Sequence, residues 1–376
     1  MDHSHPAAQG SRLRGEVVYL YAFDIAYELG REPLRELLGQ PVAQFSVDVS
    51  HRGPRNLLFH QPQMVRLPAQ ERRGPAGPVR VETSVKILPI GAISIAVRVP
   101  FEVDRLDQLI PYHDLRFNNG TLHDEVRHLA ERIRQELAPL ILRPIDHLAH
   151  EEAYTVFCIQ APVTGADGVP MNAEVWLEGH RRQVASLLAQ EDPDSLSAQE
   201  ELESTNRSLS YYADDLLVID WDAALLVDQA RDFDETLHIL ELANVQLAEL
   251  EAYDRVLDAA LERSYRDLGA TPMRRRSEVL RDLRELRIDM TRFNDELSNI
   301  TKFFGDWHLA RVYEAVAARF HLADWHRAVS DKLRTLDELH QLLKSDQASR
   351  WMMVLEVTIV LLFIIDLAIL FLGVRS

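Results

Sequence analysis

The chain has 376 residues, of which 47% are hydrophobic and 27% charged, enough for two soluble domains and one membrane span. The net charge is −18 and comes from residues 151–376, since residues 1–150 carry 18 basic and 18 acidic side chains. Such an acidic surface repels phosphates, so direct binding of nucleic acid is not expected. The single cysteine, Cys158, excludes an internal disulfide. It lies in the apolar run YTVFCIQ and is expected to be a buried structural thiol in a reducing compartment.

Residues 1–14 are predicted to be a disordered leader, and they lack the apolar core of a signal peptide. Residues 15–230 are predicted to form a mixed α/β globular domain, because strand patterns rich in Val and Tyr alternate with helical ones. Residues 50–78 are rich in Pro, Gly and Arg and predict a surface loop. Strands are expected at residues 16–23, 45–49, 79–88, 92–101 and 154–160, with 79–88 and 92–101 as a hairpin, and helices at 33–38, 104–109, 121–142 and 175–190.

The segment DDLLVIDWDAALLV, which starts at Asp214, predicts one buried strand, because its apolar run lies between acidic ends. Asp220, Trp221 and Asp222 close that strand. Two acids beside an aromatic residue indicate either a cation or acid–base site, or a turn with Trp221 packed under the helices. From Asp214 to Asp258 the chain has 13 acids against two bases. This density favours a solvated helix face, with a surface for divalent cations or basic proteins as the alternative.

Residues 231–348 predict long helices, arranged as a helical hairpin or coiled coil. Leucines at three-and-four spacing indicate a helix at residues 235–268, which Gly269 would end. Further helices are expected at 271–304, 309–320 and 322–344, and the last is expected to continue into the apolar C-terminal stretch. The predicted fold class is therefore α+β, with an N-terminal mixed domain, long antiparallel helices and a single C-terminal transmembrane helix.

Residues 349–376 form the predicted anchor. In its apolar stretch, residues 351–374, 16 of 24 residues are Leu, Ile, Val or Phe. A helix of that length is about 36 Å long, and a bilayer core is about 30 Å thick. Glu356 and Asp366 interrupt the stretch, about 80° apart around the helix axis. Acids inside membranes usually have a partner, so both are expected to contact another helix; alternatively, Glu356 reaches the interface and only Asp366 is buried. We expect a single-pass, tail-anchored protein of the inner (cytoplasmic) membrane, with its soluble domain in the cytoplasm.

Motifs for nucleotide binding or nucleophilic catalysis are missing from the sequence, which contains no GxxxxGK[ST], GxGxxG or GxSxG. His147, His150 and Glu151 come nearest to a metal site, but the spacing of three between the histidines favours a polar loop or helix start. The basic run Arg274–Arg276 is expected to balance local charge, with an acidic neighbour or RNA as the alternative. No cofactor, metal or catalytic residue is therefore predicted.

Four stretches resemble the family of proteins "required for meiotic nuclear division", over roughly residues 15–374. They are residues 214–228, the helix at 240–258, the pattern around Tyr313 with the helix to Leu343, and the anchor LEVTIVLLFIID. The positions associated with the bacterial branch are held by Asn244, Gln246, Leu247, Tyr253 and Asp254. In the anchor, Leu355 and Glu356 match the usual Leu-Glu-Trp, Val357 replaces the aromatic residue, and Asp366 stands in place of a second Glu. The resemblance implies a membrane-tethered, self-associating scaffold without catalytic residues, like a mitochondrial member that supports organellar translation.

The leading hypothesis is a non-enzymatic, homo-oligomeric scaffold on the cytoplasmic face, which supports translation or membrane organisation. Its expected partners are itself, the membrane and an unidentified cytoplasmic protein. The candidate partner surface consists of Asp220, Trp221, Asp222, Asn244, Tyr253 and Asp254. The first alternative is a divalent-cation channel or transporter similar in architecture to magnesium channels, although that family has two spans and a Gly-Met-Asn loop. The second is a metal-dependent hydrolase that uses Asp220 and Asp222.

Overall fold

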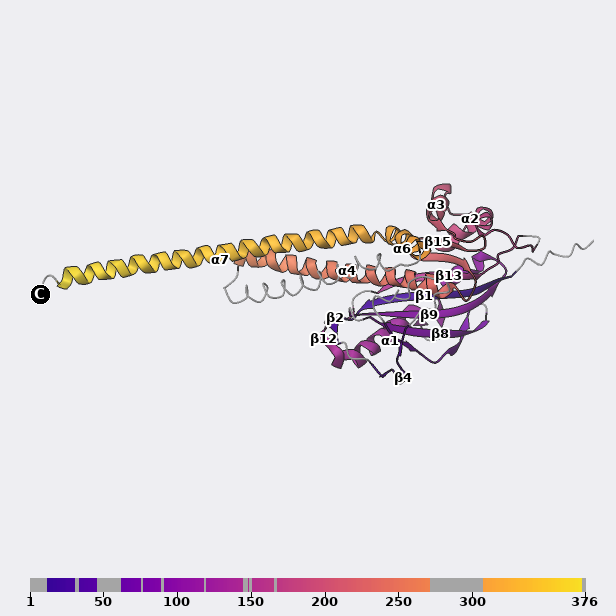
Figure 1. Ribbon diagram of the computed structural model, residues 1–376, viewed down its shortest axis with the longest axis horizontal. Coiled ribbons are helices and arrows are strands. Elements are labelled where there is room, and N and C mark those ends of the chain that lie inside the picture. The colour runs from indigo at the N-terminus through magenta and orange to yellow at the C-terminus, as the bar shows by residue number, and fades with distance from the viewer. Residues whose placement is uncertain are drawn as a thin grey trace, which may run out of the picture. The chain divides into compact units, whose positions relative to one another are not determined.

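The computed structural model describes residues 12–30, 34–45, 62–75, 77–88, 91–117, 120–144, 148, 151–165, 168–270 and 307–373. These residues confirm an α+β fold with a large mixed sheet and several helices (Figure 1). They fall into two compact units. The first consists of the described residues up to 252 together with 307–325, and the second of 253–270 together with 326–373.

The first unit is built on a ten-stranded sheet with the order β14-β15-β16-β13-β1-β9-β8-β6-β5, in which β7 also pairs with β8. Every pairing in this sheet is antiparallel except that of β13 with β16, which is parallel. The strands are β1 (Leu13–Asp24), β5 (Ala43–Gln44), β6 (Gln63–Arg66), β7 (Gln70–Gly74), β8 (Gly77–Ile87), β9 (Ala92–Val103), β13 (Glu152–Gln160), β14 (Ser208–Leu209), β15 (Leu216–Ile219) and β16 (Ala223–Asp228).

Three short antiparallel pairs accompany the main sheet. They are β2 (Ala26–Leu29) with β12 (Ile141–Pro144), β3 (Glu36–Leu37) with β4 (Gln40–Pro41), and β10 (Arg116–Phe117) with β11 (Gly120–Thr121). Gly91 holds a φ of +102°, and a Cβ there would lie 1.7 Å from the carbonyl oxygen of Ala26. Only glycine therefore fits at the turn between β8 and β9.

Alternation along β1 gives the sheet two different faces. Val17 and Tyr19 point into the main core, where the 3₁₀ helix η1 (Leu106–Tyr112), α1 (Leu122–Leu137) and α2 (Ala173–Ala189) contribute their apolar sides. Ala22 points to the opposite face and packs against Val245 and Ala248 of α4 (Phe233–Ala270). One face of the sheet carries the apolar main core, and the polar cavity described below lies on the other face.

Local sequence explains where the helices of the first unit begin. Thr121, Asn172 and Ser197 cap α1, α2 and α3 (Ala198–Thr205), and each side-chain oxygen accepts a backbone N–H from the first turn. A short 3₁₀ helix, η2 (Ala138–Leu140), follows α1 and holds Pro139 at its start. The helix α6 (Trp307–Arg319) buries Val312 and Val316.

Most of the predicted elements are confirmed, and four differ. Residues 36–37 form a strand rather than a helical turn, and residues 63–74 contain β6 and β7 rather than a continuous loop. The helix at 121–142 ends at Leu137, because the chain turns through η2 into β12. The single strand expected at 214–227 is a hairpin of β15 and β16, since a turn at residues 220–222 returns the chain. The leader predicted at 1–14 is wrong at its end, because β1 begins at Leu13, and its residues 1–11 lie outside the described residues. Most of the strand at 45–49, the helix at 271–304, His147, His150 and Arg274–Arg276 also lie outside them.

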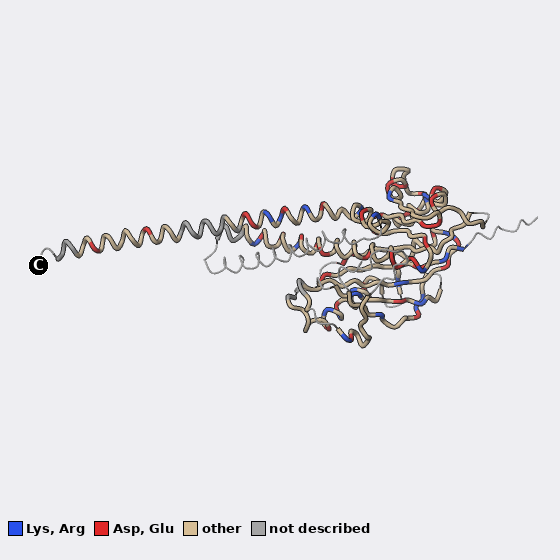
Figure 2. The backbone as a smooth tube through the Cα atoms, viewed as in Figure 1, with Lys and Arg blue, Asp and Glu red and all other residues tan. Residues whose placement is uncertain are grey.

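The second unit contains the C-terminal part of α4 and most of α7 (Leu322–Gly373), an unbroken helix of 52 residues. The Nζ of Lys332 in α7 lies 2.7 Å from Oδ1 of Asp254 and 2.7 Å from Oδ1 of Asp258, both in α4. Further along α7, Trp351–Ile369 is a 19-residue stretch with a mean hydropathy of 2.6 and no buried residue. Figure 2 shows how few charged residues lie along this end of α7. It is the one stretch of the described chain that is long and apolar enough to span a membrane.

The expected burial of Cys158 is confirmed, because this thiol is fully buried in β13. Burial raises the pKa of the thiol well above its ordinary value, so the reactive thiolate is scarce at neutral pH. We expect the native protein to react with DTNB at least about 100-fold more slowly than the protein unfolded in guanidinium. Absorbance at 412 nm would follow both reactions, and equal rates would show that Cys158 is accessible.

Candidate functional site

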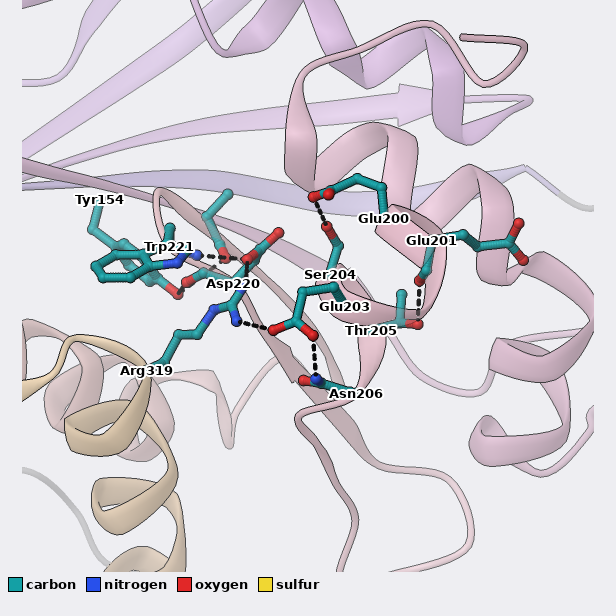
Figure 3. A network of polar contacts seen from close by, with 11 residues as sticks. Tyr154, Glu200, Glu201, Glu203, Ser204, Thr205, Asn206, Asp220, Trp221 and Arg319 are labelled. Atoms are coloured by element: carbon teal, nitrogen blue, oxygen red, sulfur yellow. Dashed lines mark hydrogen bonds and ion pairs between the residues drawn. The ribbon is translucent and has the colours of Figure 1, made fainter. Parts of the chain in front are cut away.

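The predicted acidic pair lies at the turn between β15 and β16, and only one of its members is buried. Asp220 is 5% exposed, whereas Trp221 and Asp222 are exposed. The Nη2 of Arg319 forms an ion pair with Oδ1 of Asp220, and Nη1 donates to Oε1 of Glu203 at 3.1 Å (Figure 3). The carboxylate of Asp220 is therefore already paired with a guanidinium, while Asp222 is exposed.

The contacts around Arg319 connect several elements of the first unit. The hydroxyl of Tyr154 lies 3.0 Å from the carbonyl oxygens of Asp220 and Ala223, to either of which it can donate. The guanidinium of Arg319 lies 5.8 Å from the ring centre of Trp221, and Trp221 stacks on His321 at 5.1 Å. This network joins β13, the β15–β16 turn, α3 and the C-terminal end of α6 (Figure 3). Its geometry is that of a structural junction.

A second group of polar side chains is buried between the sheet and α4. Lys86 of β8 forms an ion pair with Oε2 of Glu241 in α4, and Ser94 of β9 donates to Oε1 of the same carboxylate at 2.6 Å. All three residues are less than 10% exposed. The strand register places Lys86 directly opposite Ser94, so both side chains leave the same face of the sheet. The ring of Phe45 covers the ammonium, with 3.7 Å between Nζ and the ring centre.

Burial and neighbouring charges shift the pKa values of Glu241 and His238. Burial alone would raise the pKa of Glu241, but the Lys86 ammonium and His238 outweigh it and lower the pKa to about 2. The Nδ1 of His238 is buried without a hydrogen-bond partner, and it lies 3.9 Å from Oε2 of Glu241. Burial lowers the pKa of His238, so its ring is neutral at pH 7 and offers one donor and one acceptor.

A cavity of about 480 Å³ lies beside this group. Its floor comes from β1, β9, β8 and β6, and one wall comes from the first turns of α4. The charged side chains that line it are Arg66, Arg80, Glu82, Lys86, Arg98, Asp234 and Glu241, and His238 adds a neutral polar group. Its volume falls in the range of small-molecule sites. Among the described residues, no three His, Cys, Asp or Glu side chains gather as metal ligands do.

The remaining predicted site residues on α4 have structural contacts. Asn244 is 2% exposed, and its Nδ2 donates to the carbonyl oxygens of Leu20 at 3.3 Å and Glu152 at 3.1 Å. Tyr253 is half-buried, and Asp254 holds Lys332 in the second unit. The expectation of a solvated acidic face fails at Glu241 and Glu249, which are 6% and 4% exposed. Glu356 and Asp366 lie on the exposed surface of α7.

The sequence interpretation missed the Lys86 group. A signal for it exists, because the alternation of β8 and β9 places Glu82, Ser84 and Lys86 on one face, opposite Arg98, Ala96 and Ser94. A sheet face of small and charged residues is not an ordinary core face. The element that covers it, α4, begins about 150 residues after Lys86 in the chain, and local pattern gives no indication of that pairing.

Comparison with known proteins identifies the family of the first unit. The family model described as "Uncharacterized protein MJ0711, N-terminal domain" matches residues 14–234, more than half of the chain. A curated relative, uncharacterized protein MJ0711 of Methanocaldococcus jannaschii, is 24% identical over 220 residues, which cover 57% of this chain and 65% of the relative. The chain thus spans slightly less than two thirds of that relative's length. No solved structure matches.

The expected membership of the family "required for meiotic nuclear division" is wrong, because the family that matches is the archaeal one. The stretches that suggested it are a hairpin, parts of the helices α4, α6 and α7, and an apolar span. They follow common patterns of strand, helix and anchor and carry little family-specific information. The chain belongs to the family of the N-terminal domain of uncharacterized protein MJ0711.

Proposed function

We propose that this protein is a non-enzymatic membrane scaffold that self-associates, with its α+β domain on the cytoplasmic face. The observation that carries the proposal is the surface of α7, where every residue from Trp351 to Ile369 is exposed. Soluble monomers rarely expose so large a continuous apolar surface, whereas a helix of this length suits a bilayer core about 30 Å thick. Burial of this surface in lipid removes the cost of exposing it to water.

Self-association follows from the two acids within this surface. Glu356 and Asp366 are exposed on α7, so the described part of the chain does not shield them. Carboxylates are costly to place in hydrocarbon unless they face protein, water or a partner group. Because they lie about 80° apart around the helix, one neighbouring helix can contact both. A second copy of α7 presents the same pair, and two carboxyls that share a proton can then hydrogen bond to each other.

The charged part of α7 has a separate role within one chain. We propose that, within the second unit, the C-terminal part of α4 and the adjoining part of α7 lie antiparallel and form a stalk. The ammonium of Lys332 between Asp254 and Asp258 supports this arrangement. The three charges pair at the helix surface, where the net gain of each pair is about 1 kcal/mol or less, so apolar contacts must supply most of the stability.

The variant Glu356→Leu/Asp366→Leu tests the role of the membrane acids. We expect wild-type protein in mild detergent to form a discrete assembly with a mass that is a multiple of 43.0 kDa, and the variant to shift to single chains. Light scattering after size exclusion, with separate protein and detergent masses, would measure both. The shift is expected because leucines cannot form the carboxyl contacts that join the helices.

The matched control is Val360→Leu/Ile364→Leu, which alters the same helix without removing an acid and should leave the mass unchanged. An assembly of unchanged mass in the acid-free variant would refute the role of Glu356 and Asp366. A wild-type monomer would refute self-association altogether. If liposomes that contain the purified protein took up divalent cations, the result would favour a transport function over the scaffold.

A further inference from the structure

The cavity beside Lys86 exists because the sheet has small side chains where its floor lies. Cross-strand pairs place Arg66 beside Ser84, Ser84 beside Ala96, and Ala96 beside Leu20. Ser84 and Ala96 are too short to reach the level of α4, which covers the neighbouring part of the same face. A hollow is therefore left between α4 and β6, in a sheet whose other face is closely filled by apolar residues.

Charged side chains around the hollow are mostly paired with one another. Lys86 is bound by Glu241, and Arg80 lies 3.2 Å from Glu82. Arg98 pairs with Asp234 and also donates to Glu16 at 3.0 Å. Within the described residues, Arg66 forms no ion pair or hydrogen bond, and its side chain is exposed at the edge of the cavity. Its guanidinium is available to an incoming anion.

The balance of charge in the cavity differs from that of the whole protein. Four cationic side chains face three carboxylates there, while the chain as a whole carries −18. A local positive excess inside an acidic protein favours an anion at that site. A guanidinium with its planar set of donors recognises phosphate or carboxylate with two hydrogen bonds at once.

Deeper in the cavity, the lining suits an uncharged polar group. His238 is neutral and provides a ring nitrogen, and its Nδ1 has no hydrogen-bond partner. Ser84 adds a hydroxyl, and Phe45, 5.2 Å from the His238 ring, adds an apolar wall. Hydroxyl groups pair well with such donors and acceptors. About 480 Å³ is room for a compact metabolite rather than for a peptide.

We propose that this cavity binds a small hydroxyl-bearing organic oxyanion, with its phosphate or carboxylate on Arg66 and its hydroxyl groups toward His238 and Ser84. This ligand site goes beyond the proposed scaffold and does not depend on the membrane helix. The acids of the span and the residues of the cavity can be altered separately, so failure of one proposal leaves the other standing.

Isothermal titration of the full-length protein in mild detergent tests the site with three probes. Adenosine 5′-monophosphate and adenosine differ only in the phosphate, and citrate provides carboxylates instead. We expect adenosine 5′-monophosphate or citrate to bind with a Kd below about 1 mM, and adenosine to bind at least about tenfold more weakly than its phosphate. Binding of citrate alone would assign a carboxylate ligand, and binding of the phosphate alone a phosphorylated one.

Two variants and a control locate the binding. Arg66→Gln is expected to raise the Kd of the anion about tenfold or more, because the variant side chain loses the charge but stays long and polar. Ser84→Leu fills the floor of the cavity and should abolish binding. Arg73→Gln, an exposed arginine of β7 outside the cavity, should leave the Kd unchanged. Failure of both anions, equal affinity for adenosine and its phosphate, or equal losses in the Arg66 and Arg73 variants would overturn the proposal.

Discussion

Replacement of Arg319 by methionine is expected to lower the free energy of unfolding by about 3–5 kcal/mol. The reason is the burial of Asp220, which is 5% exposed and would be left without its counter-charge. Methionine keeps the length of the arginine stem, so the loss reports on charge rather than on packing. Guanidinium unfolding in mild detergent, followed by tryptophan fluorescence, would measure the change.

Companion variants separate the parts of this network. The double variant Arg319→Met/Asp220→Asn should lower the free energy of unfolding by less than the sum of the two single variants. The reason is that the double variant leaves no uncompensated charge. Glu203→Gln should lower the free energy of unfolding by about 1 kcal/mol or less, since the Glu203 side chain is 57% exposed. Arg311→Met, at an exposed position of the same helix, is the matched control. Equal losses for Arg319→Met and Arg311→Met would show that the buried pair does not stabilise the fold.

Acid is expected to destabilise the first unit through Glu241, the carboxylate that Lys86 holds. Its pKa is about 2 in the folded protein, against an ordinary value of 4.5. The unfolded chain therefore takes up the proton first as the pH falls. The contribution of Glu241 is complete above pH 4.5 and is lost as the pH falls toward 2. The shift corresponds to about 3 kcal/mol.

The variant Glu241→Gln isolates this contribution. At pH 7 it should be less stable by about 3–5 kcal/mol, because Lys86 stays buried without a counter-charge. Between pH 4.5 and 2 the difference from wild type should shrink by about 3 kcal/mol. Glu178→Gln, at an exposed position of α2, is the control and should follow wild type throughout. Free energies of unfolding measured at pH 7, 4.5, 3 and 2 would check this, and a constant difference between wild type and Glu241→Gln would contradict it.

Local sequence patterns predict the elements of this fold well and their partners poorly. Alternation over residues 79–101 predicts the β8–β9 hairpin, and three-and-four spacing predicts α4, α6 and α7. The apolar runs of β15 and β16 are buried on both faces and show no alternation, so the pattern predicts one strand and does not reveal the turn at Asp220. The strands β6 and β7 were missed because charged and polar residues occupy most of their positions.

The polar sites depend on contacts that no local pattern encodes. Asp220 and Arg319 are separated by 99 residues, and Lys86 and Glu241 by 155. Each member of these pairs, taken alone in the sequence, resembles a surface charge at the end of a strand or on a helix. The sequence could indicate that Asp220 and Trp221 lie at a turn. It could not show which cation would reach them, because that depends on how α6 packs on the sheet.

The ends of the ten-stranded sheet have a consequence for how copies of this protein can meet. Its outermost strands, β5 and β14, are two residues long, and β7 alongside β8 carries Glu71, Arg72 and Arg73. Such short or charged borders offer an incoming strand few backbone groups to pair with. Intermolecular strand addition, a common route from a large sheet to fibrous aggregates, is therefore disfavoured at these described borders. In the scaffold proposed above, copies would lie close together on a membrane, and these borders would keep their sheets from pairing.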